Sequence, residues 1–542
     1  MHGGIYTSVH ALGRQADRFK SGRPGGRTFV GRLVQRLTAS IAALCAAAFL
    51  AAAPAAPAAV KKPTYLVGAA TRSINPDPDG TFAGKPVYLG GYGIGGGSPV
   101  FEGRPATGIL GDGISVRAFA VSDGLHPFVI ADIETQGWFV AVKNGPYGLL
   151  DMRKQVEART AGALPAENVF IQTDHTHSGP DPLGVWGGIP EEYMRYISER
   201  TIDAIVAAYT SMRPARLYYG VAPARDLLSN QFDYDEANKV MDSDVRVLQA
   251  RGNGPPITLL NFSAHATVLG SSNTKVSGDW VQSANPMLEA RFGGPAVTVV
   301  GTLGRTQPAD RSCSDPTATT PDAQNLCKIR DYAARVVDRA SEAVANAQPI
   351  DGNPIVAARS YLITDASSNA LILGLEYGGS AVGVPLNRAE TPPWLTGNVL
   401  GTVTATARIG DVLLSAGPGE MYPQIPLRVS ATVPARGYMT AGLANDQLGY
   451  LIAPFEAYPE PIRRSFFNQR GDEVSPIDND NYFFNVSTTM GERVTCAFLR
   501  GAGETAGLGL AYWNRYERCP LFADDAVVPH GTDTQMPSGG TG

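Results

Sequence analysis

Short apolar segments of strand length alternate with longer amphipathic segments along most of this chain. Strands are predicted at Ser115–Ala120, Pro127–Ile133, Asn168–Thr173, Ile257–Phe262, Ala296–Val300 and Asp411–Ala416. Helices are predicted at Leu149–Ala161, Pro190–Met212 and Pro321–Gln348, where apolar residues recur at three- and four-residue steps. Such alternation is typical of sheets covered by helices. The sequence therefore predicts the α/β class, with mixed twisted β-sheets packed between α-helices in a single large catalytic domain.

The start of the chain has the composition of a targeting segment. Arg27, Arg32 and Arg36 precede an Ala-rich apolar run that ends near Ala59. Residues 1–59 are therefore predicted to be a signal peptide with a long basic leader, and the protein to be secreted or held in the periplasm or cell envelope. An uncleaved membrane anchor is the alternative. Because the apolar run is short for a transmembrane helix, no stable membrane span is expected.

The charge is unevenly distributed. The chain has a formal net charge of −5, and residues 1–60 contribute +6 from seven Lys+Arg and one Asp, so the remainder carries −11. An acidic body argues against nucleic-acid binding, which depends on a basic surface. The expected partner is a small-molecule or lipid substrate, and the oligomeric state is left open. Residues 60–525 are assigned to the catalytic domain and residues 526–542, rich in Gly, Ser and Thr, to a disordered tail.

Four cysteines remain beyond the leader, and an exported protein is expected to oxidise them. Proximity in the sequence favours the disulfides Cys313–Cys327 and Cys496–Cys519. A thiolate metal site is the alternative, but none of the spacings resembles a zinc knuckle.

Two of the five histidines beyond the leader directly follow one predicted strand. His175 and His177 occur in the segment Asp174–Pro180, which ends in a Gly-Pro turn. In extended chain, residues two apart point to the same side, so both imidazoles can reach one site. A lone histidine is usually a core or surface residue, but this pair in a histidine-poor chain favours a metal or catalytic site.

A third histidine and a carboxylate also follow predicted strands. His265 ends the apolar segment that begins at Leu259, and Glu420 closes a Pro-Gly-Glu segment after Asp411–Ala416. Two histidines and one carboxylate form a catalytic zinc set with an open position for water. Taken alone, Glu420 is better explained as a helix-start cap than as a ligand. A His-x-His pair also occurs in metal-dependent barrel hydrolases, but those need more histidines than this chain offers.

Five segments occur in the order known from one enzyme family. They are Leu89–Tyr92, Asp174–Asp181, His265 with Asn273–Asp279, Pro418–Glu420 and Gly449–Tyr458. By these segments the chain resembles the neutral/alkaline (non-lysosomal) ceramidase family over about residues 65–505. The His-Thr-His-Ser-Gly-Pro and Ser-Gly-Asp segments are the specific ones, and the others support the resemblance by their order.

The resemblance implies a secreted zinc-dependent hydrolase that uses zinc-activated water to cleave the amide bond of an N-acylated, sphingolipid-like substrate. It implies four zinc ligands: His175, His265, Glu420 and Tyr450. His177 is expected to act as an acid/base group beside the metal, and Gly91 and Tyr458 to contact substrate. The alternatives are a zinc amidase or esterase for another substrate, and a zinc-retaining binding protein without turnover.

The sequence departs from the family at several positions. Gln307 stands in the catalytic centre where the family's Gly-Asp-Val-Ser-Pro-Asn segment has its serine, and Gln231 replaces an arginine. Because glutamine is no nucleophile, Gln307 is expected to bind a polar headgroup or the carbonyl. Asp174 also departs, either as a carboxylate that orients a ligand histidine or as a solvated turn residue. The chain is expected to lack the family's C-terminal β-sandwich.

Overall fold

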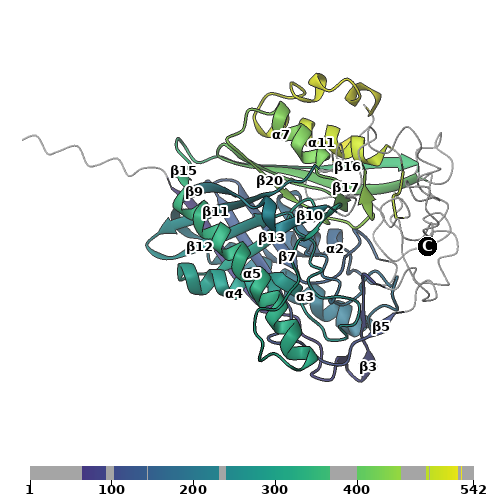
Figure 1. Cartoon of the computed structure of the whole chain (residues 1–542). Helices are drawn as coiled ribbons and strands as arrows, with labels where there is room; N and C mark the ends of the chain where they lie inside the picture. The colour runs from purple at the N-terminus through teal and green to yellow at the C-terminus, as the bar shows by residue number, and fades with distance from the viewer. Residues whose placement is uncertain are drawn as a thin grey trace, which may run out of the picture. The chain divides into compact units, whose positions relative to one another are not determined.

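The computed structural model describes most of the chain beyond the leader: residues 64–92, 103–142, 145–230, 240–366, 399–452, 484–487, 489–522 and 526–527 (Figure 1). The predicted leader and most of the predicted tail lie outside these residues. The chain divides into two compact units, residues 1–62 and 63–542, and all described residues belong to the second. Among the described residues, no helix has the length and apolar character required to cross a membrane.

A twisted sheet of nine strands forms the centre of this unit. Its order is β13-β12-β11-β9-β1-β6-β7-β8, and β15 pairs with β9. The bounds are β1 Tyr65–Ser73, β6 Ser115–Ser122, β7 Pro127–Ile133, β8 Val169–Thr173, β9 Arg213–Pro223, β11 Asp244–Gly252, β12 Gly254–Phe262, β13 Ala296–Val300 and β15 Gln348–Pro349. Only the β7/β8 and β12/β13 pairs are parallel.

A second sheet of five strands lies against the first. Its order is β20-β18-β17-β16-β22, with bounds β16 Val356–Ala366, β17 Val399–Ile409, β18 Val412–Ala416, β20 Gly437–Ala441 and β22 Ala526–Val527. Side chains alternate along the strands: Phe119 and Val121 join the core between the two sheets, whereas Ala118 and Ala120 face the outer helices. The fold is therefore a sandwich of two sheets with helices on both outer faces.

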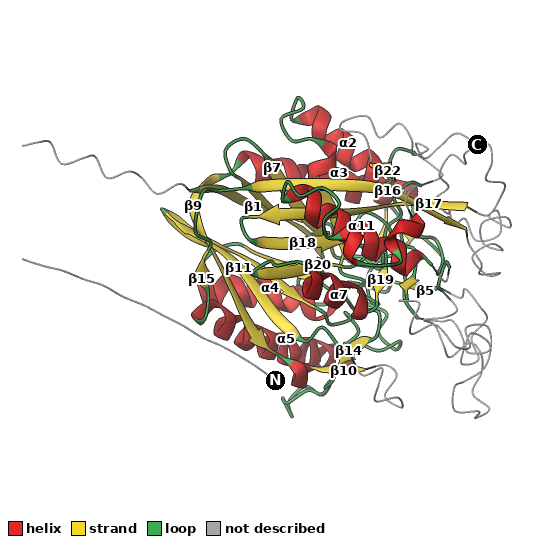
Figure 2. Ribbon diagram, turned by 90° about the horizontal axis from the view of Figure 1, so that it is seen from above, coloured by secondary structure: helices red, strands yellow, loops and turns green. Residues whose placement is uncertain are grey.

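The helices form the outer layers (Figures 1 and 2). Those on the nine-stranded sheet are α2 Leu149–Arg159, α3 Glu191–Thr210, α4 Asp279–Phe292 and α5 Pro321–Ala345. Those on the second sheet are α7 Gln424–Thr432 and α11 Met490–Thr505. Four short pairs of strands complete the described part: β2 Thr81–Phe82 with β3 Lys85–Pro86, β4 Tyr88–Leu89 with β5 Arg104–Pro105, β10 Leu228–Asn230 with β14 Thr306–Pro308, and β19 Glu420–Met421 with β21 Tyr450–Leu451.

The predicted α/β class, strands and helices are confirmed, with shifts at their ends. The helix α5 ends at Ala345, three residues before its predicted end, because Gln348 opens β15 and pairs with Tyr219 of β9. Both predicted disulfides are present: one ties the loop before α5 to that helix, and the other ties α11 to the segment after it.

Sheet twist brings distant strand ends together. β8 and β12 are six steps apart in the strand order and antiparallel along it, so in a flat sheet their carboxyl ends would lie at opposite edges. Strands turn by about 20–25° per step, which accumulates to about 120–150° over this distance. The segment after β20 spans the two sides, since Gly442 N–H donates to Val300 of β13 and the Leu443 carbonyl accepts from Thr173 of β8. The loops after β8 and β12 therefore meet.

Candidate metal centre

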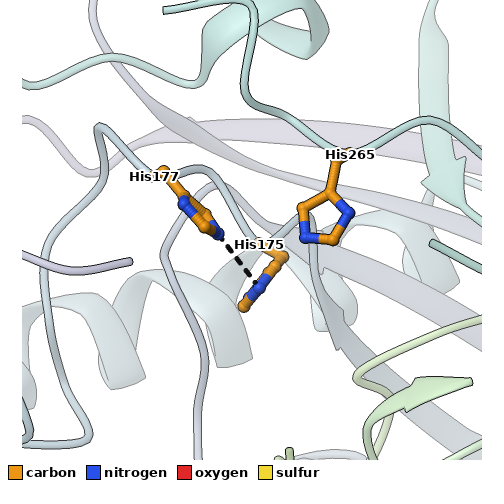
Figure 3. Close-up of side chains that lie close together, drawn as sticks. All are labelled: His175, His177 and His265. Carbon is orange, nitrogen blue, oxygen red and sulfur yellow. Dashed lines mark hydrogen bonds between the residues drawn. The ribbon is translucent and has the colours of Figure 1, made fainter. Parts of the chain in front are cut away.

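Three imidazoles converge between these loops (Figure 3). His175 and His177 follow β8, and His265 follows β12. The Nε2 atoms of His175 and His177 are 3.2 Å apart, and the ring centroids of His175 and His265 are 5.1 Å apart. The ligand atoms of all three lie within 4.8 Å of one another, so these residues could hold a metal ion.

The backbone between the two histidines after β8 is not extended, in contrast to the prediction from the sequence. His175 has a φ of +59°, the left-handed region that non-glycine residues rarely adopt. Its ring stands at 82° to that of His177, with the centroids 4.8 Å apart. Such a backbone costs about 1–3 kcal/mol and persists where the surroundings enforce it, most often at functional sites. A strained turn, not strand alternation, therefore aims the two rings at one place.

Glu420 completes the group from the second sheet's side. It opens β19, and its carboxylate oxygens lie 3.3 Å from Nε2 of His175 and 3.3 Å from Nε2 of His265. Its backbone pairs in parallel register with Tyr450, the first residue of β21. The fold thus brings three of the predicted ligands together and places the fourth beside Glu420.

Backbone carbonyls determine which nitrogen of each ring faces the carboxylate. Nδ1 of His175 lies 2.6 Å from the Gln136 carbonyl, and Nδ1 of His265 lies 2.8 Å from the Leu303 carbonyl. A carbonyl only accepts, so each Nδ1 carries a proton and each Nε2 faces Glu420, the atom that carries the lone pair in the Nδ1–H tautomer. Two lone pairs then face an anionic acceptor, an arrangement that a cation between them would stabilise.

The donor set fits a tetrahedral metal ion. Nε2 of His265 and Oε2 of Glu420 are buried and make no hydrogen bond with described residues, a costly state for polar atoms. Two zinc ligands at about 2.0–2.2 Å from the ion, at the tetrahedral angle, lie about 3.3–3.6 Å apart. The 3.3 Å separations from Glu420 to the two imidazoles match this value.

Burial and mutual charge set the protonation of the group. Burial alone would raise the pKa of Glu420, but His175 and His265 hold it well below its usual range, so Glu420 is a carboxylate. Burial lowers the pKa of His265. Burial, followed by the charges of His175 and His265, holds the pKa of His177 well below its usual range. At neutral pH Glu420 is therefore ionised, and the lowered pKa values of His177 and His265 favour their neutral rings, the forms that bind a metal.

Solved structures, and not sequence comparisons, show which fold this chain has. No protein-family profile and no curated protein matches the sequence. The crystal structure of neutral ceramidase from Pseudomonas aeruginosa is similar over 83% of this chain and 76% of its own, with a TM-score of 0.60 and 18% identity. The chain has the neutral ceramidase fold. A ceramidase complexed with C2 is similar over 82% of this chain and 76% of its own, with a TM-score of 0.59 and 19% identity.

Within the neutral ceramidase fold, Gly91 lies against the His177 ring. It has a φ of +87°, and a Cβ at this position would come within 2.3 Å of the imidazole. Tyr92 packs edge-on against the same ring with the centroids 4.7 Å apart, and its hydroxyl donates to the Leu269 carbonyl at 2.8 Å. The glycine is thus required by a close approach to His177, and its predicted contact with substrate stays a prediction.

Arg104 is a site residue that the sequence analysis missed. Its guanidinium donates to the carbonyls of Gly90 and His177 and lies 4.9 Å from the centre of the Tyr92 ring. Arg104 follows residues outside the described part, and no spacing in the sequence relates it to the histidines. Only the β4/β5 pairing brings it beside Gly90.

Gln307 lies in β14, next to the loop that holds His265. The preceding residue, Thr306, accepts the His265 backbone N–H at 3.2 Å. The side-chain oxygen of Gln307 accepts from the Thr267 hydroxyl at 2.6 Å and from Arg311 at 2.9 Å. Gln307 therefore lies beside the metal centre with its carbonyl end fixed. The predicted substrate contact Tyr458 and the substitution at Gln231 lie outside the described residues.

Asp174 fills neither of its two predicted roles. It is fully buried, so it is not a solvated turn residue. It does not orient His175 either, because the Gln136 carbonyl holds Nδ1 of that ring. Instead, its Oδ1 accepts the Thr176 N–H at 3.2 Å and so holds the turn between the two histidines.

Proposed function

We propose that this protein is a zinc-dependent hydrolase of the neutral ceramidase type, which cleaves the amide bond of an N-acylated, sphingolipid-like substrate. The observation that carries the proposal is the meeting of His175, His265 and Glu420 at 3.3 Å separations within the neutral ceramidase fold. Two disulfides among the described cysteines support an exported protein, in keeping with the predicted leader.

Four side chains would hold the metal: His175, His265, Glu420 and, from the strand beside Glu420, Tyr450. Zinc bound there would polarise the amide carbonyl and lower the pKa of water to about 7. The backbone carbonyls of Gln136 and Leu303 keep both imidazoles in the tautomer that such binding requires.

His177 is the acid/base group in this proposal. It is half-buried, its pKa is held well below its usual range by desolvation and by the neighbouring histidines, and its Nε2 lies 3.2 Å from Nε2 of His175. It can accept a proton as water attacks the amide carbonyl carbon and return that proton to the amine as the C–N bond breaks. The products are a fatty acid and a free amine. No side-chain nucleophile is required, which agrees with Gln307 at the family's serine position.

The test combines metal content with hydrolysis of ceramide. Purified protein is expected to hold about one zinc per chain, and His175→Ala and Glu420→Ala to lose it. The matched control is His126→Ala, since His126 is exposed and pairs with Asp123 at the surface. Fatty-acid release should require the metal and stop with a chelator. Protein that takes up no zinc when it is offered would refute the hydrolase.

The two alternatives predict different results from the same experiment. An amidase or esterase for another substrate would release fatty acid from a different acyl compound, still in a chelator-sensitive manner. A binding protein would retain zinc and release nothing.

A further inference from the structure

The loop between β14 and α5, residues 309–320, carries Arg311 beside the metal centre. Its neighbours are tied to α5: Asp310 forms an ion pair with Arg335 at 2.8 Å, and Cys313 is bonded to Cys327. Asp310 also accepts the Ser312 N–H at 2.9 Å. The backbone on both sides of Arg311 is therefore anchored to a helix of the main sheet, which leaves little freedom for the loop.

Arg311 itself turns away from α5 and toward the site. Its Nη2 donates to the side-chain oxygen of Gln307 at 2.9 Å, and the same oxygen accepts from the Thr267 hydroxyl at 2.6 Å. Thr267 is two residues beyond His265. The Arg311 charge also acts on Tyr92, which packs against His177: burial and the Asp279 carboxylate raise the pKa of Tyr92, and the Arg311 charge opposes that rise.

The two side chains together present hydrogen-bond donors. The oxygen of Gln307 already accepts two bonds, so its NH2 group is the part left to bind a ligand. Arg311 is exposed, and no carboxylate of the described residues lies within ion-pair distance of it. A guanidinium beside an amide NH2 complements a carboxylate.

We propose that Arg311 and Gln307 bind a carboxylate on the amine part of the substrate, so that the preferred substrates are N-acyl amino acids. This inference rests on the proposed amide hydrolysis. An N-acyl lipid carries its polar groups on the amine part, next to the amide, whereas its acyl chain is apolar. Donors placed beside the metal centre therefore serve the amine part. Hydrolysis of such a substrate gives a fatty acid and a free amino acid.

The test uses two compounds that differ in one group. N-dodecanoylglycine carries a carboxylate where N-dodecanoylethanolamine carries a neutral hydroxymethyl group. Wild-type protein is expected to favour the glycine compound in kcat/KM. Arg311→Gln should raise KM for that compound about tenfold, and KM for the ethanolamine compound much less. Arg311→Lys should retain part of the preference, because it keeps the charge and loses the planar fork.

The matched control is Arg330→Gln. Arg330 is exposed on α5, so this variant removes the same charge without touching the Gln307 pair. It should leave both KM values unchanged, and unaltered thermal unfolding would show that all variants are folded. Equal kcat/KM for the two compounds in wild type, or the same loss in Arg330→Gln as in Arg311→Gln, would overturn the inference.

Binding to metal-free protein separates this inference from the hydrolase proposal. Without metal the compounds are not turned over, so calorimetric titration measures the contribution of Arg311 alone. Wild type should bind N-dodecanoylglycine about tenfold more tightly than Arg311→Gln does, with no difference for the ethanolamine compound. Selective binding to metal-free protein, together with no hydrolysis of either compound by zinc-loaded protein, would refute the hydrolase and keep the carboxylate site. Hydrolysis of both compounds by zinc-loaded protein, without selective binding to metal-free protein, would keep the hydrolase and refute the carboxylate site.

Discussion

The site has two adjacent parts whose side chains are oriented in different ways. One is the group of metal donors, which includes His265, and the other is the pair of Gln307 and Arg311. The metal donors are buried, and their orientation comes from backbone carbonyls of Gln136 and Leu303. The Gln307–Arg311 pair is partly exposed, and its orientation comes from side-chain bonds. A backbone carbonyl remains when the residue that provides it is substituted, whereas a side-chain hydrogen bond is lost with its side chain. The orientation of the metal donors is therefore expected to be less sensitive to substitution of their supporting residues than the orientation of the Gln307–Arg311 pair.

The largest effect should follow from removing the carboxylate on the backbone-supported side. Glu420→Gln keeps the shape of the side chain but replaces the anion that faces both imidazoles. Zinc content should fall from about one to near zero per chain, and hydrolysis should fall by more than about 100-fold, the upper range for partners of metal ligands. Metal analysis and turnover measure this directly. Full zinc content in the variant would remove Glu420 from the ligand set.

Gly91→Ala should misplace His177 and leave the metal bound. The added Cβ would meet the imidazole at 2.3 Å, so turnover should fall about 100-fold, the effect of an ångström-scale displacement. The control is Gly162→Ala, which has a similar φ of +80° but no atom within 4 Å of the new Cβ. If both variants lose the same activity, backbone strain is responsible and His177 is not.

Glu134 is a buried carboxyl group, and its substitution measures what burial of its charge costs in stability. Burial raises its pKa to about 7, so the folded state holds a proton that the unfolded state releases near its ordinary value of 4.5. Stability should therefore fall as pH rises from about 5 to 7. Glu134→Gln should stabilise metal-free protein by about 1–3 kcal/mol at pH 8 and have little effect at pH 5. Denaturant unfolding measures this, with exposed Glu517→Gln as control. A gain at both pH values would contradict the titration.

The smallest effect should follow from loosening the side-chain support of Gln307. Thr267→Val keeps the volume and removes the hydroxyl that donates to Gln307 at 2.6 Å. Loss of one neutral hydrogen bond is expected to lower kcat/KM for N-dodecanoylglycine about two- to tenfold. Zinc content should not change, because Thr267 contacts none of the donors' supporting carbonyls. A fall in zinc content would show that the two parts of the site are not independent.

Much of the donor set could be predicted because its signals are local. His175, His265 and Glu420 each follow a predicted strand closely, and strand ends are where polar side chains gather. The role of Asp174 and the contribution of Arg104 could not be predicted. Asp174 bonds to the turn that holds His175, and Arg104 reaches Gly90 only through a pair of two-residue strands. Such short elements carry no periodic signal.

Six strands, three helices, the two disulfides and the chemical types of the candidate metal donors could be predicted from the sequence, because each depends on neighbours close along the chain. That these donors meet follows from the packing of the whole unit. β8 and β12 point in opposite directions in the strand order, and accumulated twist together with the segment after β20 brings their loops into contact. Likewise, Arg311 turns to Gln307 because its neighbours are tied to α5. Twist and anchoring are properties of the whole packed unit, so no local pattern contains them.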